Sequence, residues 1–286
     1  GTYENSFATG ITTGGGTDET GQSLTFTLSA ADRSLFSAQP AMTNTGVLTF
    51  TPAEDKNGST SVSVELTDGG NTVIKSFTIT ILPVNDQPSF TDTGNIDVEE
   101  DCGAKTIAWV SGYLLGPANE IQTPTFSMTE DSRTTYGNAE LFSSGPVINA
   151  LTGTVSFTPA ANANGSVTFT VTLCDNGGTD REGIELSQTH SLTISIDDVN
   201  DDPTYSISAA VGVNEDGGEY RNASFATGIS RGGGTDEADQ SLTFTLSGYN
   251  TDLFDGDITL SNTGELLFST AANAHGSTTV NVSLSD

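Results

Sequence analysis

An internal repeat constrains this 286-residue chain more than any other feature of its sequence. The segments Ser6–Ser29 and Ser224–Ser247 have the same residue at all but four positions. A more divergent copy lies between them, and a Leu-Phe pair marks all three copies, at Leu35, Leu141 and Leu253. A period of about 110 residues indicates tandem copies of one structural unit. Such arrays more often span distance or present surfaces than carry out chemistry.

The chain is strongly acidic, with 37 Asp and Glu against 8 Lys and Arg and a net charge of −29. This charge disfavours binding to nucleic acid through phosphate neutralisation, and to an anionic membrane surface, and it makes cations the natural partners. Disorder is disfavoured because the apolar residues are regularly spaced. No run approaches the roughly 18 apolar residues of a membrane helix, so we expect no membrane insertion.

Apolar residues alternate with small polar ones in all three copies. The pattern is clear at Leu24–Leu28, Val62–Leu66, Phe77–Ile81, Val167–Leu173, Leu192–Ile196, Leu242–Leu246 and Val280–Leu284. A period of two residues predicts half-buried β-strands. With turn residues between them, about seven short strands per copy predict an all-β fold of tandem immunoglobulin-like β-sandwiches. Trp109 aligns with Phe7 and Phe225, so we expect it in a core.

The repeats predict three domains, at residues 1–86, 87–201 and 202–286. The first copy lacks the Glu-Asp pair that opens the other two, and the third stops before its last strand. We therefore expect the first domain to be truncated at its N-terminus and the third at its C-terminus. Two short linkers join the copies, at residues 84–88 and 198–203.

Strand directions predict where the acidic loops lie. The last strand of each copy ends at a linker, so this end is the lower pole. The strand before it runs the opposite way and carries Asp68, Asp175 or Asp286 to the upper pole. The first strand is expected to start at the upper pole, after Glu100 and its equivalents, and to run down to the loop that holds Glu120.

Stacking the copies end to end then gathers acidic and amide side chains at both junctions. At the first junction we predict Asp18, Glu19, Asn85, Asp86, Glu100, Asp101 and Asp175. At the second junction we predict Glu120, Asp198, Asn200, Asp201, Glu215, Asp216 and Asp286. So many carboxylates repel one another unless a cation lies between them, and such oxygen donors are those that calcium takes. The sequence therefore predicts calcium at both junctions, and the alternative is a solvated acidic rim.

These motifs resemble the cadherin-like tandem repeats of large bacterial extracellular proteins and adhesins. The linker Asp198–Asp201, the Glu-Asp entry, the Gly-rich loop ending in Asp-Glu, the Phe-Thr-Pro-Ala run and the Asp-Asn-Gly-Gly turn carry the resemblance, which covers essentially the whole chain. It implies cadherin-like β-sandwich domains in an extended array that calcium stiffens. Pro83 stands where the first linker Asp would be, and residues 118–120 read Ala-Asn-Glu where the sister copies read Thr-Asp-Glu. Because of Pro83, we expect fewer or weaker ions at the first junction.

The resemblance implies a structural stalk or spacer segment of a bacterial surface adhesin, located on the cell surface or secreted. Its partners would be calcium ions and the neighbouring repeats of the same chain. Two alternatives stay open: a module that binds a carbohydrate or another cell surface, and the subunit of an extracellular filament in which another copy supplies the missing strand. His190 and His275 lie in different copies and no catalytic motif is present, so we expect no enzymatic activity.

Two cysteines, Cys102 and Cys174, both lie in the middle copy. The strand directions place both at its upper pole, where a disulfide between them would require an oxidising compartment. The alternative is a pair of separate buried thiols.

Overall fold

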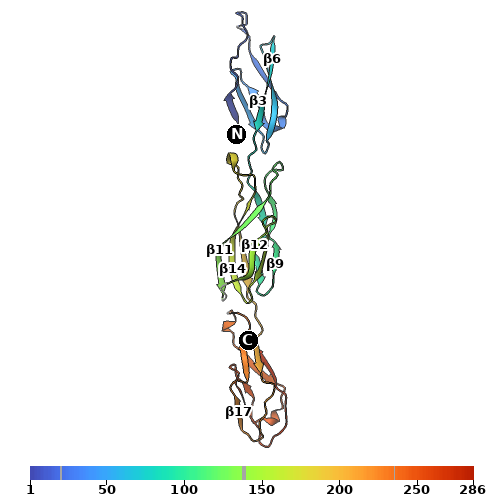
Figure 1. Ribbon diagram of the computed structural model, residues 1–286, viewed down its shortest axis with the longest axis vertical. Coiled ribbons are helices and arrows are strands. Elements are labelled where there is room, and N and C mark those ends of the chain that lie inside the picture. The colour runs from blue at the N-terminus through green and yellow to red at the C-terminus, as the bar shows by residue number, and fades with distance from the viewer. Residues whose placement is uncertain (20, 137–139, 235) are drawn as a thin grey trace. The chain divides into compact units, whose positions relative to one another are not determined.

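The computed structural model describes residues 1–19, 21–136, 140–234 and 236–286, which form almost entirely β-structure (Figure 1). The chain divides into two compact units. Unit 1 comprises Gly1–Thr91, Gly112–Thr125 and Leu173–Gln188, and unit 2 comprises Asp92–Ser111, Phe126–Thr172 and Thr189–Asp286. The first linker lies within unit 1 and the second within unit 2. The division into three domains stays a prediction.

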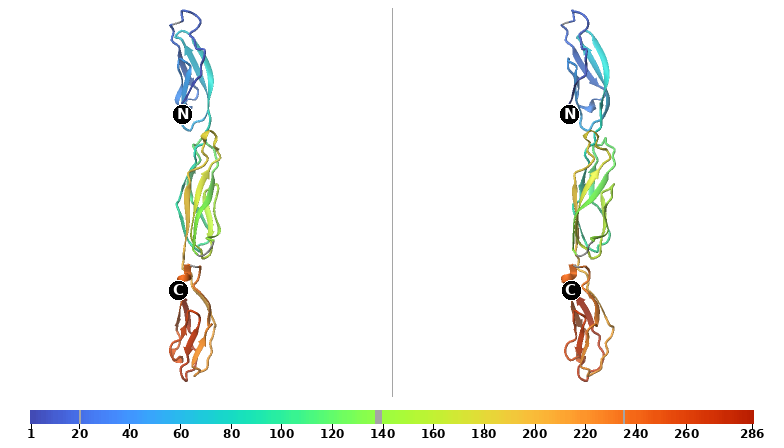
Figure 2. Two further views of the ribbon diagram at one scale, coloured as in Figure 1. Left: turned by 90° about the vertical axis from the view of Figure 1, so that its left-hand side faces the viewer. Right: turned by 60° about the vertical axis from the view of Figure 1, so that its left-hand side comes forward.

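Unit 1 contains two three-stranded antiparallel sheets (Figure 1; Figure 2). One sheet has the order β1 (Tyr3–Ser6), β4 (Val47–Pro52) and β3 (Phe36–Met42), and the other β2 (Thr25–Ala30), β5 (Gly58–Thr67) and β6 (Thr72–Ile81). Phe36 of the first sheet and Val62 and Ile79 of the second belong to one buried cluster. The sheets therefore face each other across a shared core, as in a β-sandwich.

The middle of the chain forms a four-stranded sheet, a three-stranded sheet and a two-stranded one. Their orders are β11 (Thr125–Tyr136), β14 (Asn164–Cys174), β15 (His190–Asp197) and β8 (Ile96–Glu99); β12 (Phe142–Ile148), β13 (Thr154–Pro159) and β9 (Lys105–Ala108); and β10 (Val110–Leu114) with β7 (Ser89–Asp92). β15 pairs antiparallel with β14 but parallel with β8, and the parallel register places Glu99 opposite Asp197. This parallel pair decides where Glu100 lies.

The last part of unit 2 contains two two-stranded sheets and one three-stranded sheet. They are β16 (Thr204–Ile207) with β18 (Ala226–Ser230); β19 (Thr243–Ser247) with β22 (Asn281–Ser285); and β17 (Glu219–Asn222), β21 (Leu266–Ser269) and β20 (Thr259–Leu260). Phe225, Leu260, Leu266 and Phe268 form its buried core, against which Phe244 packs. Short 3-10 helices precede or join strands at η1 (Arg33–Leu35), η2 (Asp180–Glu182), η3 (Asp236–Asp239) and η4 (Thr251–Leu253).

The predicted alternation is confirmed in the central strands. Val167, Val171, Leu192 and Ile194 of β14 and β15 are at most 1% exposed. Between them, Thr168 and Thr193 stay partly exposed, and their hydroxyls hydrogen-bond across the strands at 3.0 Å. One face of the pair is thus core and the other meets solvent, as a period of two residues requires.

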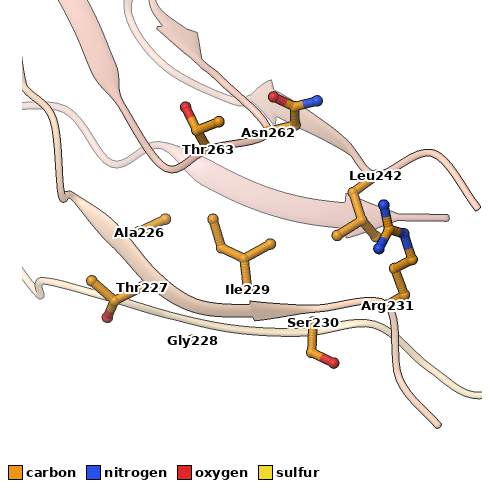
Figure 3. A pocket seen from close by; sticks show the side chains of 9 residues that line it. All are labelled: Ala226, Thr227, Gly228, Ile229, Ser230, Arg231, Leu242, Asn262 and Thr263. Carbon is orange, nitrogen blue, oxygen red and sulfur yellow. The ribbon is translucent and has the colours of Figure 1, made fainter. Parts of the chain in front are cut away.

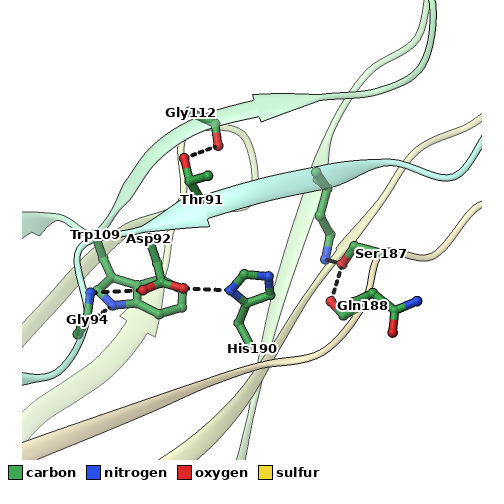
Figure 4. A network of polar contacts seen from close by, with 9 residues as sticks. Thr91, Asp92, Gly94, Trp109, Gly112, Ser187, Gln188 and His190 are labelled. Carbon is green, nitrogen blue, oxygen red and sulfur yellow. Dashed lines mark hydrogen bonds and ion pairs between the residues drawn. The ribbon is translucent and has the colours of Figure 1, made fainter.

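Trp109 is fully buried, which confirms its predicted place in a core. Its indole Nε1 donates to the Gly94 carbonyl at 2.7 Å, and the Gly94 amide donates to Asp92 Oδ1 at 2.8 Å. Asp92 Oδ2 lies 2.6 Å from His190 Nδ1 at the start of β15 (Figure 4). These polar contacts surround the indole, so the largest buried side chain also meets its hydrogen-bonding requirement.

Along the described ranges, we find no helix with the length and apolar character that crossing a membrane requires.

Candidate cation sites at the two linkers

The first linker, residues 84–88, is held by acidic and amide side chains of unit 1. The Asp86 amide donates to Glu120 Oε1 at 3.3 Å. Asn85 is buried, and its Nδ2 donates to Asp175 Oδ1 at 3.0 Å. Gln122 Nε2 donates to Asn85 Oδ1 at 2.5 Å and to Glu120 Oε2 at 3.2 Å. We call these five residues the first linker cluster.

Negative charge is concentrated in this cluster. Burial raises the pKa of Glu120, and the nearby carboxylates of Asp86, Asp175 and Asp55 raise it further, against the lowering effect of the Asp86 amide. A raised carboxyl pKa means that the surroundings disfavour the ionised form. A cation would relieve this penalty.

The second linker, residues 198–203, is held in a similar way within unit 2. The Val199 amide donates to Glu100 Oε1 at 2.9 Å, and the Asp201 amide donates to Glu237 Oε1 at 3.2 Å. Gln240 Nε2 donates to Asn200 Oδ1 at 2.6 Å, and Asn200 Nδ2 donates to Asp286 Oδ2 at 3.4 Å. The second linker cluster consists of Glu100, Asn200, Asp201, Asp236, Glu237, Gln240 and Asp286.

Glu100 gives the strongest indication of a cation site in the second cluster, because this acidic residue is only 3% exposed. Burial is the main cause that raises its pKa, and the carboxylates of Asp236, Asp101 and Asp201 add to the effect, whereas the bond from the Val199 amide lowers it. Glu237 is equally buried. Two carboxyl groups are therefore kept from water beside further acidic groups.

Both clusters contain buried side-chain oxygens without a hydrogen-bond donor. In the second cluster they are Glu100 Oε2, Asp201 Oδ2, Asp236 Oδ1, Glu237 Oε2 and Gln240 Oε1; in the first they are Asp175 Oδ2 and Gln122 Oε1. An unpaired buried oxygen of this kind is costly, and an ionised one more so.

These oxygens bear on whether the donors suit calcium. Carboxylate and amide oxygens are the hard ligands that this ion takes, and both clusters mix the two types. A Cβ at Gly233 would overlap the Asp201 carboxylate, so the glycine lets the Gly-rich loop approach that group closely. Yet in the described part of the chain, no three His, Cys, Asp or Glu side chains form a group that could hold a metal ion. The donor chemistry fits calcium, and the present side-chain arrangement is not a complete acidic cage.

The structure corrects which acidic groups share a linker. Glu120 lies at the first linker and not the second, and Glu100 lies at the second and not the first. The error has one cause: β8 precedes Glu100 and runs parallel to β15, so Glu100 lies beside the end of the last strand. The following strands then return the chain to the Glu120 loop. Asp101 stays with Glu100, as its effect on the Glu100 pKa shows, and its Oδ1 accepts from the Asn162 amide at 3.4 Å.

Three other predicted residues, Glu215, Asp216 and Glu19, have contacts away from the linkers. Glu215 Oε2 lies 3.8 Å from His275 Nδ1, and Asp216 Oδ1 accepts from the Asn273 amide at 2.8 Å. Glu19 accepts through its backbone carbonyl from Gln22 and donates through its amide to Gly16, within the loop that also contains Asp18. Asp198 is exposed on the second linker itself. Asn85, Asp86, Asp175, Asn200, Asp201 and Asp286 have contacts at the linkers to which they were assigned.

Gln122, Asp236, Glu237 and Gln240 belong to the clusters but were absent from the predicted set. The Asp236-Glu237 pair was visible in the sequence as the equivalent of Asp18-Glu19, and the same error about the poles kept it out of the set predicted for the second linker. The two glutamines recur at equivalent positions of the repeat, as does Gln22, so the repeat itself carried a signal for them that the motif analysis missed.

Cys102 and Cys174 are free thiols in the structure, so the predicted disulfide is not formed there. The Cys174 thiol donates to the Asp175 carbonyl at 3.1 Å, and burial, with Glu185 and Asp175 nearby, raises its pKa. A high thiol pKa disfavours the reactive thiolate. The pairing stays a prediction for an oxidising compartment.

A separate cavity of about 550 Å³ lies in unit 2 beside β18 (Figure 3). Its lining consists of Ala226, Thr227, Gly228, Ile229, Ser230, Arg231, Leu242, Asn262 and Thr263. Arg231 Nε is engaged by the Gln240 carbonyl at 2.7 Å. None of the nine lining residues is aromatic, so the cavity lacks the ring surface on which sugars commonly stack.

A family match supports an immunoglobulin-like fold for the middle of the chain. Residues 85–187 match the family model described as the bacterial Ig domain. A search of curated proteins returned no match. Among solved structures, mouse protocadherin-24 EC1-3 is 16% identical, with a TM-score of 0.44 over 87% of this chain and 77% of that chain.

Two human structures are similar at a comparable level. Protocadherin-24 EC1-2 is 19% identical, with a TM-score of 0.41 over 63% of this chain and 84% of its own. The desmocollin-1 ectodomain is 17% identical, with a TM-score of 0.37 over 91% of this chain and 53% of its own. Likenesses this weak say nothing about ligands or partners. The middle part of the chain, residues 85–187, is similar to the bacterial Ig domain family, and the all-β, immunoglobulin-like fold class predicted from the sequence is confirmed.

Proposed function

We propose that this chain is a structural spacer segment of a bacterial surface adhesin, and that calcium bound at its two linkers stiffens it. One observation carries the proposal: buried carboxylate and amide oxygens without hydrogen-bond donors gather around both linkers. Such oxygens are costly at neutral pH unless a cation compensates them. The internal repeat and the match to a bacterial Ig domain support the spacer role and the bacterial source.

The residues that would hold calcium at the second linker are Glu100, Asp201, Asp236 and Glu237, with amide oxygens from Gln240 and Asn200. At the first linker they would be Asp86, Glu120 and Asp175, with Gln122. When bound, the ion supplies positive charge that neutralises these carboxylates. The side chains themselves fix the linker, since Glu100, Glu120 and Glu237 already accept linker amides. The second cluster has more unpaired oxygens than the first, and we expect it to bind calcium more tightly.

The proposed location is the cell surface or the extracellular medium. Extracellular calcium modules have dissociation constants of roughly 0.1–1 mM, which cytoplasmic calcium cannot saturate. The remaining partner assignments, to other copies of the chain or to a cell-surface glycan, stay alternatives. The absence of enzymatic activity stays a prediction. The cavity beside β18 does not favour the glycan alternative, because no aromatic side chain lines it.

Calcium is expected to raise the melting temperature and to restrict the linkers. At calcium tenfold above the dissociation constant, each site adds about 1.4 kcal/mol to the free energy of unfolding. The measurement is a thermal melt with parallel small-angle X-ray scattering, in 5 mM calcium (about tenfold above the expected constant) and in excess chelator. A higher melting temperature and a narrower distribution of intramolecular distances in calcium are expected. Identical melts and scattering curves in both conditions would exclude calcium binding at the linkers, and a plain spacer with solvated acidic rims would remain.

A further inference from the structure

The connection between β14 and β15 is longer than its counterpart in the first copy. β5 ends at Thr67 and β6 starts at Thr72, so four residues, 68–71, join them. β14 ends at Cys174 and β15 starts at His190, which leaves residues 175–189 between them. We call residues 176–188 the strap. The short connection closes on itself, because Asp68 Oδ1 accepts from the amides of Gly70 and Asn71.

The strap instead lies along the first linker, within unit 1. The Ile184 amide donates to the Asn85 carbonyl at 3.0 Å, and Asn85 Nδ2 donates back to the Ile184 carbonyl at 2.8 Å. Two residues further along, Gln87 Nε2 donates to the Leu186 carbonyl at 2.8 Å. One main-chain bond and two bonds from linker side-chain amides to strap carbonyls therefore join linker and strap.

The base of the strap is tied to β14, which gives it a firm support. The Ser187 amide donates to the Leu173 carbonyl at 2.9 Å, and the Leu173 amide donates to Ser187 Oγ at 2.9 Å. The Asp175 amide donates to the Glu185 carbonyl at 3.0 Å. The strap residues that hydrogen-bond to the linker are thus anchored to β14, a strand of the core.

At its tip the strap turns through two non-glycine residues with positive φ, Arg181 (56°) and Glu182 (69°). Such backbone is costly and persists when its surroundings fix it. The turn brings Arg181 Nη1 to 3.4 Å from the Pro83 carbonyl. Pro83 occupies the position of the first linker Asp in the other linker, so a cationic side chain lies where the linker lacks a carboxylate.

Gly183 packs directly against the linker. It is buried, and a Cβ there would lie 3.0 Å from Asn85 Cβ and 2.9 Å from the Gly178 carbonyl oxygen. Its φ of −60° is one that any residue adopts, so the lack of a side chain serves the close contact and not the backbone conformation.

We propose that the strap fixes the first linker by protein contacts even when no metal ion is bound, and that Arg181 supplies positive charge there. Carboxylates accept linker amides at both linkers, but their second oxygens differ. Glu120 Oε2 at the first linker accepts from Gln122 Nε2, whereas the second oxygens of Glu100 and Glu237 at the second linker have no donor. The contrast with the second linker rests on the proposed calcium binding, whereas the metal-free lock at the first linker does not. The chain would then combine one linker that is already fixed before calcium binds with one whose rigidity depends on calcium.

Hydrogen exchange of the intact chain in excess chelator tests the lock. The Ile184 amide is expected to exchange about tenfold or more slowly than an unstructured amide, because its acceptor is the Asn85 carbonyl. Gly183→Ala should remove this protection by pushing the strap off Asn85, while the amides of β14 and β15 stay protected and show that the chain is folded. Gly70→Ala is the matched control, since a Cβ there meets nothing closer than Asp68 Oδ1 at 3.6 Å.

Three outcomes would overturn the proposal: an unprotected Ile184 amide in the wild-type chain, full protection in Gly183→Ala, or equal loss in Gly70→Ala. All three are measured by hydrogen exchange in excess chelator, without calcium. A failure of the strap is therefore distinguishable from a failure of the proposed calcium sites, which the comparison of melts in calcium and in chelator reports separately.

Discussion

Trp109→Ala is expected to lower the free energy of unfolding by about 3–5 kcal/mol, the usual cost of truncating a buried aromatic residue to alanine. Trp109 is fully buried, and the substitution both empties its site and leaves the Gly94 carbonyl without its indole donor (Figure 4). Urea denaturation followed by circular dichroism measures the loss, which should appear in the transition that involves β14 and β15.

Two controls separate packing from hydrogen bonding. Trp109→Phe keeps an aromatic ring but removes the donor to Gly94, so about 1–3 kcal/mol should be lost. Phe7 occupies the equivalent position in the first copy but is 46% exposed, and Phe7→Ala should cost clearly less than Trp109→Ala. Equal losses from Phe7→Ala and Trp109→Ala would contradict the assignment of Trp109 as a central core residue.

The strands were predictable because burial on one face leaves a direct mark on the sequence. In β14 the buried Val167, Phe169, Val171 and Leu173 occupy every second position, and no other regular structure gives that period. The repeat strengthened the prediction, because the same pattern recurs at equivalent positions. The acidic character of the linkers was equally visible from Asp198 onwards.

The assignment of acidic groups to poles failed because it depended on strand count and direction before Glu100. Counting Glu100 as the start of the first strand overlooks β8, whose parallel pairing with β15 reverses the inferred pole. β8 is a four-residue strand, too short for alternation to reveal it. Strand pairing of this kind is a property of the folded sheet, and a single sequence does not specify which strands become neighbours.

The strap illustrates a second limit. Its sequence contains turn residues, which predict a loop. The segment that it contacts is the first linker, about 100 positions earlier, and turn residues do not indicate a partner so distant in the sequence. One bond between Ile184 and Asn85 joins main-chain groups, which every residue has, and the other comes from the Asn85 side chain, which the sequence marked only as part of the acidic linker. Within the strap, the lack of a side chain at Gly183 reflects the contact, but glycine is common in loops of every kind because it fits several turn types.

Glu100→Gln is expected to have opposite effects with and without calcium. Glutamine keeps the acceptor for the Val199 amide but removes a buried charge beside Asp236, Asp101 and Asp201. In excess chelator at pH 7 the variant should be more stable than the wild type by roughly 1–3 kcal/mol, because an uncompensated buried charge is lost. The rise in melting temperature from chelator to millimolar calcium should be smaller for the variant than for the wild type, because one charged ligand is missing.

The pH dependence gives this prediction a further check. The pKa of Glu100 is raised in the folded chain, so the folded state holds the proton more tightly than the unfolded state. The stability that protonation contributes is present below the unfolded pKa and is lost as the pH rises through the folded pKa. In chelator, the extra stability of Glu100→Gln over the wild type should therefore be largest at neutral pH. It should shrink as the pH falls through the folded and then the unfolded pKa of Glu100.

Glu215→Gln is the matched control, since Glu215 is the equivalent Glu of the next copy and its side chain is 55% exposed. It should change the melting temperature little in either condition. A Glu100→Gln variant that is less stable in chelator at pH 7 would mean that the wild-type carboxylate is already compensated by protein groups. The second linker would then need no cation, and its acidic residues would hold the chain by hydrogen bonds alone.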